Sequence, residues 1–333
     1  MGQTRTSTHF FTKTVAQGLR RKCGVGPCQR LLVAVSGGVD SVALLRSLHQ
    51  LAPRRRWKLE LCVGHVQHHL RDDAETDAAF VEQLANDLDL PHLRVDVDLS
   101  THTGNLESAA RRARYRALGE MATVFGATHV VTAHQADDQL ETMLMRLLRG
   151  ASVRGMSAMA WRRTLQSGSN IQLIRPMLSV DRATAKQFLD SLGQTWREDR
   201  TNADTTRLRA QLREQVLPTL RAVQSDVSDR AVKLADHLRD VAQLVEEAVE
   251  AAAEKIDSTI NRAEAREMPR VVLFGLLRKL LIETGVPADR LGGRIINPIV
   301  RAIRDHTGGH RTFELSKGIH MEITRESVTI ESS

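Results

Sequence analysis

The stretch from Arg30 to Ser41 constrains the fold of this 333-residue chain more strongly than any other. Residues 31–35 form a continuous apolar run, which is typical of a parallel strand covered on both faces. Residues 41–48 have apolar side chains at helical spacing. Between the two, Gly37 and Gly38 allow a tight turn, and the following helix N-terminus offers unpaired N–H groups to an anion. The stretch therefore predicts a phosphate-binding loop between a strand and a helix.

The rest of the sequence places this loop in an α/β fold. Neither a Walker loop nor a dinucleotide-binding glycine motif is present. Strand-like and helix-like segments alternate, which predicts a parallel doubly wound sheet with its ligand site at the carboxyl ends of the strands. The pattern changes near residue 223, so we expect domains over 1–222 and 223–333, the second being a smaller α+β domain.

The individual elements follow from the same periodicities. In the first domain we expect strands at 31–35, 58–66, 93–97 and 128–132, and helices at 11–19, 41–48, 72–89, 106–125 and 136–149. In the second we expect helices at 229–253, 271–282 and 293–304, followed by strands at 311–315, 319–323 and 327–330.

The hexapeptide Ser-Gly-Gly-Val-Asp-Ser resembles the pyrophosphate loop, or PP-loop, of the ATP pyrophosphatase superfamily. These enzymes adenylate a carbonyl oxygen and release pyrophosphate. The resemblance implies that the ATP phosphates are held by Ser36, Gly37, Gly38, Val39, Asp40 and Ser41, and that Asp40 also helps to place Mg²⁺. The simpler alternative is a strand–helix turn in which Ser36 or Asp40 only caps the helix.

A second polar segment, from His134 to Thr142, directly follows the expected strand 128–132. Asp137 and Glu141 lie one helical turn apart and therefore share a face. Three carboxylates and a histidine at the end of a strand can position Mg²⁺, hold a cationic substrate or accept a proton from an attacking amine. Carboxylates in a first helical turn can also serve only as partners of the helix dipole.

The order His-x-x-Asp-Asp-x-x-Glu-Thr after a PP-loop resembles the tRNA(Ile)-lysidine synthetase family. The segment from Glu107 to Tyr115 agrees, because it places Glu107, Arg111 and Arg114 on one helical face, although a solvated salt-bridge ladder would look the same. The resemblance implies that the catalytic residues are Asp40, Asp137, Glu141, Arg111, Arg114 and His134, and that the Mg²⁺ ligands are Asp40 and Asp138.

Six arginines and no acidic residue lie between Glu141 and Asp181. Such a stretch suits a phosphate backbone, although an ordinary basic loop is the alternative. Residues 196–218 also resemble the family's segment that closes the catalytic domain. The expected tRNA-binding residues are Arg146, Arg149, Arg154, Arg209 and Arg213. Departures from the family pattern occur at Gln67, His69, Arg207 and Ala210.

By this resemblance, the chain is expected to ligate L-lysine to C2 of the wobble cytidine of the CAU-anticodon tRNA(Ile), using ATP and Mg²⁺. Dimers occur in the family, so a homodimer is among the expected states. Two alternatives stay open. One is a tRNA thiolase of the same superfamily, which commonly uses cysteine pairs, and the other is an RNA-binding module without catalysis.

The composition agrees with a polyanionic partner, and the cysteine pattern agrees with a reducing compartment. The net charge of +7 suits a polyanion, although it can also serve solubility. Three cysteines without a C-x-x-C pair do not form an even disulfide framework. Neither an N-terminal apolar signal region nor an 18-residue apolar run is present, so we expect a cytoplasmic protein without a membrane partner.

Overall fold

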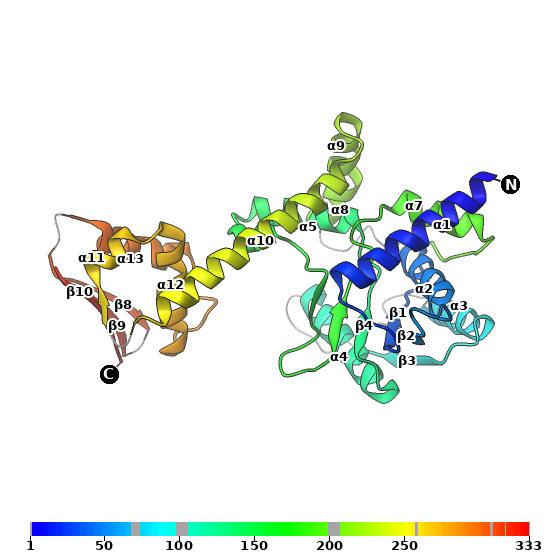
Figure 1. Cartoon of the computed structure of the whole chain (residues 1–333), viewed down its shortest axis with the longest axis horizontal. Helices are drawn as coiled ribbons and strands as arrows, with labels where there is room; N and C mark the ends of the chain where they lie inside the picture. Colours follow the sequence, from blue (N-terminus) through cyan, green and yellow to red (C-terminus); the bar gives the residue numbers. More distant parts are fainter. Residues whose placement is uncertain are drawn as a thin grey trace. The chain divides into compact units, whose positions relative to one another are not determined.

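A computed structural model describes residues 2–67, 74–97, 106–198, 207–256, 259–306, 309–316 and 318–332 (Figure 1). For residues 2–9, 74, 106, 107, 207 and 332 it describes the backbone only. The chain divides into two compact units, residues 1–237 and 238–333. No helix in the ranges described is both long enough and apolar enough to cross a membrane.

The first unit is built on a six-stranded sheet with the strand order β3-β2-β1-β4-β6-β5. Its strands are β1 (Arg30–Ala34), β2 (Glu60–Gln67), β3 (His92–Asp96), β4 (His129–Val131), β5 (Arg162–Thr164) and β6 (Gln172–Ile174). All neighbours are parallel except β5, which pairs antiparallel with β6 at the edge. The parallel doubly wound sheet predicted from the sequence is confirmed, and the β5–β6 hairpin is an addition that the sequence analysis did not anticipate.

Helices cover both faces of this sheet. The helices that lie wholly within the first unit are α1 (Gly2–Gln17), the π-helix η1 (Gly18–Lys22), α2 (Val39–Leu51), α3 (Ala74–Asp87), α4 (Leu106–Phe125), α5 (Ala136–Leu148), α6 (Val153–Met156), α7 (Arg182–Ser191), α8 (Arg207–Gln211), the π-helix η2 (Leu212–Val216) and α9 (Leu217–Val223). In β1, Leu31 and Val33 join the core cluster that contains residues of α1, α2 and α7, whereas Leu32 joins the cluster formed with α4. Burial on both faces explains the continuous apolar run of this strand.

The sheet order reverses between β1 and β4. From β1 the chain proceeds outward through β2 and β3, and then returns to place β4 on the other side of β1. In an open α/β sheet, a crevice forms at such a switch point, outside the carboxyl ends of the two strands. The loop after β1 and the loop after β4 therefore meet at the position where this fold binds ligands.

The long helix α10 (Val227–Ala253) begins in the first unit and continues into the second. The other elements of the second unit are β7 (Thr259–Asn261), α11 (Arg262–Glu267), α12 (Arg270–Glu283), α13 (Gly293–Arg304), β8 (Arg311–Ser316), β9 (Ile319–Ile323) and β10 (Ser327–Ser332). The strands form an antiparallel sheet in the order β7-β10-β9-β8. The α+β character predicted for this region is confirmed, while β7 and α11 were not anticipated.

A buried arginine ties the second unit together. Arg262 has no exposed surface. Its guanidinium donates hydrogen bonds to the backbone oxygens of Ala302 (2.8 Å), Ile303 (3.2 Å) and Asp305 (2.9 Å), and also to that of Thr324. The charge thus lies at the C-terminal end of α13, where the carbonyl groups and the helix dipole favour a cation.

Candidate active site

The loop between β1 and α2 is shaped by its glycines and serines. Gly37 has a φ of +88°, which favours glycine, and a Cβ at this position would lie 3.4 Å from Cγ of Arg197. The backbone N–H of Ser36 donates to Oγ of Ser41 (3.2 Å), and this hydroxyl donates to the carbonyl oxygen of Gly38 (2.9 Å). These bonds fold the loop over the N-terminus of α2, in the form expected of an anion-binding turn.

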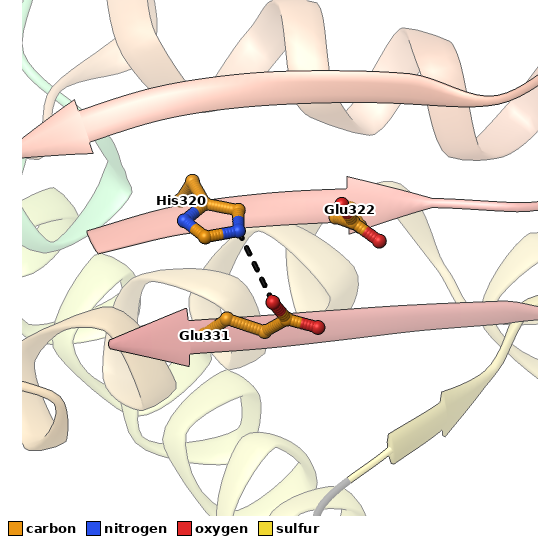
Figure 2. Close-up of side chains that lie close together, drawn as sticks. All are labelled: His320, Glu322 and Glu331. Atoms are coloured by element: carbon orange, nitrogen blue, oxygen red, sulfur yellow. Dashed lines mark ion pairs between the residues drawn. The ribbon is translucent and has the colours of Figure 1, made fainter. Parts of the chain in front are cut away.

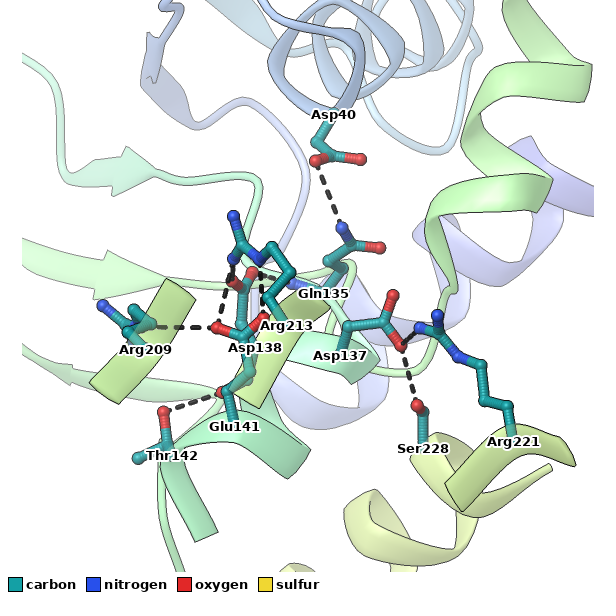
Figure 3. A network of polar contacts seen from close by, with 10 residues as sticks. All are labelled: Asp40, Gln135, Asp137, Asp138, Glu141, Thr142, Arg209, Arg213, Arg221 and Ser228. Carbon is teal, nitrogen blue, oxygen red and sulfur yellow. Dashed lines mark hydrogen bonds and ion pairs between the residues drawn. The ribbon is translucent and has the colours of Figure 1, made fainter. Parts of the chain in front are cut away.

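Asp40, in the first turn of α2, faces the loop that follows β4. Its Oδ2 accepts a hydrogen bond from Nε2 of Gln135 (3.2 Å), while its buried Oδ1 has no hydrogen-bond partner among the described residues (Figure 3). Burial raises the pKa of Asp40 to about 7, Arg182 opposes the rise, and Asp138 and Asp137 add to it. An unpaired buried carboxylate oxygen can coordinate a cation or accept a hydrogen bond from a ligand.

Asp138 and Glu141 lie on one side of the first turns of α5. Asp138 caps the helix, because its Oδ2 accepts a hydrogen bond from the backbone N–H of Gln135 (2.9 Å). Glu141 is fully buried, and Arg213 donates to both of its oxygens, through Nε at 2.8 Å and Nη2 at 3.1 Å. Arg209 lies on the same carboxylate, with Nε 3.3 Å from Oε2 (Figure 3). Glu141 therefore holds two arginines in place and is not a free carboxylate.

Asp138 and Arg213 influence each other's pKa values, and the charge of Glu141 affects both. Burial raises the pKa of Asp138, and Glu141 adds to the rise, while the backbone N–H of Gln135 and the guanidinium of Arg213 oppose it. Burial alone would lower the pKa of Arg213, but its bonds to Glu141 and the charge of Asp138 raise it overall. Arg213 therefore stays charged between two carboxylates.

Asp137 points to a different set of partners. Its Oδ1 accepts a hydrogen bond from Oγ of Ser228 (2.7 Å) and forms an ion pair with Arg221 (Figure 3). Ser228 lies in the first turn of α10 and Arg221 lies in α9. Asp137 thus connects the start of α5 to α9 and to the first turn of α10, whereas Glu141 contacts Arg209 and Arg213.

A cavity of about 320 Å³ lies between the two loops. This volume falls at the lower end of the range for small-molecule sites. Its polar lining consists of Ser36, Asp40, Ser41, Arg114, Thr132, His134, Gln135, Asp138, Arg182 and Arg213. Thr132 and His134 form a hydrogen bond between Oγ1 and Nδ1 at 2.9 Å. Burial and the nearby arginines, Arg175 first among them, hold the pKa of His134 well below its usual range, so this ring is neutral at the cavity wall.

A group of arginines surrounds Tyr115 of α4, the one tyrosine in the sequence. The guanidinium carbons of Arg111, Arg163 and Arg114 lie 5.0, 5.1 and 5.5 Å from the centre of its ring. Burial alone would raise the pKa of Tyr115, but the positive charges of these arginines and of Arg175 lower it overall. The ring of Tyr115 thus holds three guanidinium groups close together, and one of them, that of Arg114, lines the cavity.

The structure brings half of the predicted phosphate-binding, catalytic and Mg²⁺-binding residues to one cavity. The cavity lining contains Ser36, Asp40, Ser41, Arg114, His134 and Asp138, whereas Gly37, Gly38, Val39, Arg111, Asp137 and Glu141 lie outside the lining. Of the predicted tRNA-binding residues, Arg209 and Arg213 lie on Glu141. Arg149 and Arg154 are exposed, while Arg146 donates to the backbone oxygens of Ala158 (3.1 Å) and Gly155.

Sequence reasoning missed Arg182, Gln135, Thr132, Arg221 and Ser228 as residues of this region. Arg182 follows the N-cap residue Asp181 at the start of α7, far from both loops in the sequence, and no local pattern marks it. His69 and residues 199–206 of the segment that resembles the end of the family's catalytic domain fall outside the described residues, as do the side chains of Glu107 and Arg207.

Comparisons with known proteins identify the family of the first unit. The PP-loop domain family matches residues 9–220. A tRNA(Ile)-lysidine synthase from Ruegeria pomeroyi is 45% identical over 186 residues, which cover 56% of this chain and 43% of that protein. A tRNA(Ile)-lysidine synthase from Nostoc sp. is 32% identical over 274 residues, which cover 77% of this chain and 78% of that protein. The chain thus spans less than half the length of some curated relatives that it matches.

A solved structure gives the same fold. It is that of a U34-tRNA thiolase from Methanococcus maripaludis, with its iron–sulfur cluster, at a TM-score of 0.57 and 13% identity, covering 69% of this chain and 79% of that chain. At this identity the likeness concerns the fold alone. The PP-loop geometry, the family match and the curated relatives together lead to one conclusion: the chain belongs to the tRNA(Ile)-lysidine synthase family of PP-loop proteins.

Proposed function

We propose that this protein ligates lysine to the wobble cytidine of the CAU-anticodon tRNA(Ile). The C2 carbonyl oxygen of cytidine attacks the α-phosphate of ATP, and pyrophosphate leaves. The ε-amine of lysine then attacks C2 and loses its protons, and the oxygen departs with AMP. The observation that carries this proposal is the convergence of the PP-loop and the His134–Asp138 segment on one cavity, in a chain that belongs to this family.

The PP-loop is the proposed binding site for the ATP phosphates. The loop backbone and the hydroxyls of Ser36 and Ser41 lie at the N-terminus of α2, where an anion is favoured. Asp40 fits a divalent cation, because its Oδ1 is buried and has no hydrogen-bond partner among the described residues. Asp138 fits less well, since one of its oxygens accepts from Gln135 and the other faces Arg213. Mg²⁺ would neutralise charge on the ATP phosphates.

Residues outside the PP-loop are proposed to bind the lysine and to stabilise the negative charge of the phosphates. A neutral His134 at the cavity wall can accept a hydrogen bond from the incoming amine, and Arg114 can stabilise negative charge on phosphate or on the lysine carboxylate. Arg111 lies beside Arg114 on the ring of Tyr115 and supports the same charge. Asp137 and Glu141 position α9, Arg209 and Arg213 around the cavity, and through these contacts they act on the reaction.

The tRNA is the partner that the basic surface favours. Arg149 and Arg154 are exposed in a window of 39 residues, 142–180, that contains six arginines and no carboxylate. We propose that they bind the phosphate backbone near the anticodon, with the second unit adding further tRNA contacts. ATP, lysine and tRNA are all cytoplasmic, where we place the protein, and its three cysteines are free.

The direct test is the transfer of labelled lysine to tRNA. We expect incorporation into a CAU-anticodon tRNA(Ile) transcript, dependent on ATP and accompanied by release of pyrophosphate and AMP. A transcript in which the wobble cytidine is replaced by uridine is the matched control and should accept no lysine. Absence of incorporation by a protein that binds both ATP and this tRNA would contradict the proposal.

The thiolase alternative is disfavoured by the cysteines. Burial raises the pKa of Cys23 to about 12 and that of Cys62 to about 11, so neither thiol ionises near neutral pH. The described residues that line the cavity include no cysteine. An ATP–pyrophosphate exchange assay with the tRNA separates the remaining alternative, an RNA-binding module without catalysis, because such a module supports no exchange.

A further inference from the structure

The outward face of the second unit's sheet is polar and rich in carboxylates, although the whole chain carries a net charge of +7. Along β9, Met321 and Ile323 are buried in the core of this unit, while His320 and Glu322 alternate with them and are partly exposed. Glu331 of β10 stands directly opposite His320 in the antiparallel register. The alternation of the strands therefore gathers an imidazole and two carboxylates on one side of the sheet.

These three side chains lie close together (Figure 2). One donor atom of each lies within 4.8 Å of the donor atoms of the others, and Nε2 of His320 is 3.2 Å from Oε2 of Glu331. A second imidazole comes from the segment before β8, where Nε2 of His310 is 3.5 Å from Oε2 of Glu322. In the part of the chain that the structure describes, no other three His, Cys, Asp or Glu side chains meet at such a spacing.

Two of the separations between donor atoms match those of ligands around one metal ion. Zinc binds histidine nitrogen and carboxylate oxygen at about 2.0–2.2 Å, and a tetrahedral arrangement then separates neighbouring ligand atoms by roughly 3.4 Å. The two histidine–glutamate distances, 3.2 and 3.5 Å, lie within a few tenths of an ångström of this value. Imidazole nitrogen favours zinc and its transition-metal neighbours, whereas Mg²⁺ and Ca²⁺ prefer oxygen ligands.

We propose that His320, Glu322 and Glu331 bind a divalent transition-metal ion of the zinc class, with His310 within reach as a fourth ligand. Two carboxylates balance the double positive charge of the ion, and the imidazoles bind as neutral rings. The ion would join β9, β10 and the segment before β8, and so stabilise the sheet. This site lies in the second unit and is independent of the PP-loop cavity.

The test measures Zn²⁺ binding by the full-length, tag-free protein after treatment with a chelator. Equilibrium dialysis followed by metal analysis should give one tightly bound equivalent of Zn²⁺. His320→Ala and Glu331→Gln should each weaken that binding by about tenfold or more, since even the loss of an outer-shell partner of a metal ligand has an effect of this size. His306→Ala and Glu326→Gln are matched controls, because both residues are exposed in the same unit and lie outside the group.

A second measurement keeps the test independent of folding. Zn²⁺ should raise the thermal unfolding midpoint of the wild type and of both control variants, but not that of His320→Ala, whose circular dichroism should match the wild type. The proposal is overturned if the folded wild type binds no stoichiometric Zn²⁺, which would leave a simple cross-strand ion pair. It is equally overturned if the bound ion survives His320→Ala but is lost with Cys28→Ser, because the ligand would then be the exposed thiol.

Discussion

Gln135 donates a hydrogen bond from Nε2 to Oδ2 of Asp40 over 3.2 Å, and so joins two loops that lie 95 residues apart in the sequence. One loop follows β1 and the other follows β4, on either side of the point where the sheet order reverses. The bond engages one oxygen of Asp40. The other oxygen, Oδ1, is buried and has no hydrogen-bond partner among the described residues. It links the two loops that line the cavity.

We expect Asp40→Asn to abolish the proposed lysine transfer and to stabilise the protein at neutral and alkaline pH. Burial raises the pKa of Asp40 to about 7, whereas the unfolded chain loses this proton near its ordinary value of 3.8. The folded state is therefore penalised increasingly as the pH rises from about 4 to about 7, and by about 4 kcal/mol above that range, since each pKa unit corresponds to about 1.4 kcal/mol. Asparagine carries no such penalty.

Unfolding midpoints measured across this pH range check the prediction. The two proteins should coincide near pH 4 and diverge as the pH rises, with the variant the more stable. Asp190→Asn is the matched control, because Asp190 is exposed on α7, and its profile should follow the wild type. A variant that is less stable than the wild type at about pH 8 would show that Asp40 is held as a stabilising anion instead.

Glu141→Gln should destabilise the first unit strongly. Glu141 is fully buried and compensates Arg213 and Arg209, so its neutral analogue removes the carboxylate charge that both guanidinium groups contact. Breaking a buried pair from one side lowers the free energy of unfolding by about 3–5 kcal/mol. Urea denaturation followed by circular dichroism measures the loss, and Glu214→Gln, at an exposed position of η2, should be neutral. Equal midpoints for the two variants would contradict the buried network.

Arg262→Lys should loosen the second unit without affecting the PP-loop cavity. The guanidinium of Arg262 reaches four backbone carbonyl oxygens, and an ammonium group cannot span them. Each buried carbonyl left unpaired costs about 1–3 kcal/mol. Hydrogen exchange should accelerate in α13 and β7–β10, while Arg325→Lys, at an exposed turn, should leave exchange unchanged. Unaltered exchange in the Arg262 variant would argue against this anchoring role.

Alkylation should distinguish the cysteines by their environments. Cys28 is exposed, whereas burial raises the pKa of Cys23 to about 12 and of Cys62 to about 11. Only thiolates react readily, so iodoacetamide at about pH 7.5 should modify Cys28 alone in the folded protein. Mass spectrometry of the intact protein and of its peptides counts the sites, and the protein unfolded in urea should take up three groups. Rapid modification of Cys62 in the folded protein would contradict its burial.

Local periodicity determined much of the fold in advance. The apolar run of β1, the helical spacing of α4 and α5 and the alternation of β8 to β10 are properties of neighbouring residues, so the sequence alone identifies them. The short strands β5, β6 and β7 escaped this reasoning, because three residues are too few to establish a period. Pairing with the existing sheets made them strands.

The sequence by itself determined that a phosphate-binding turn follows the first strand, and that carboxylates follow the fourth. Only the tertiary structure decided which carboxylates face the cavity. Glu141 meets Arg213 across 72 residues and Asp137 meets Ser228 across 91, so both are engaged elsewhere, while Asp40 and Asp138 line the cavity. The reason is physical: helical spacing fixes the face on which a side chain lies, but its partners depend on which distant segments pack against that face.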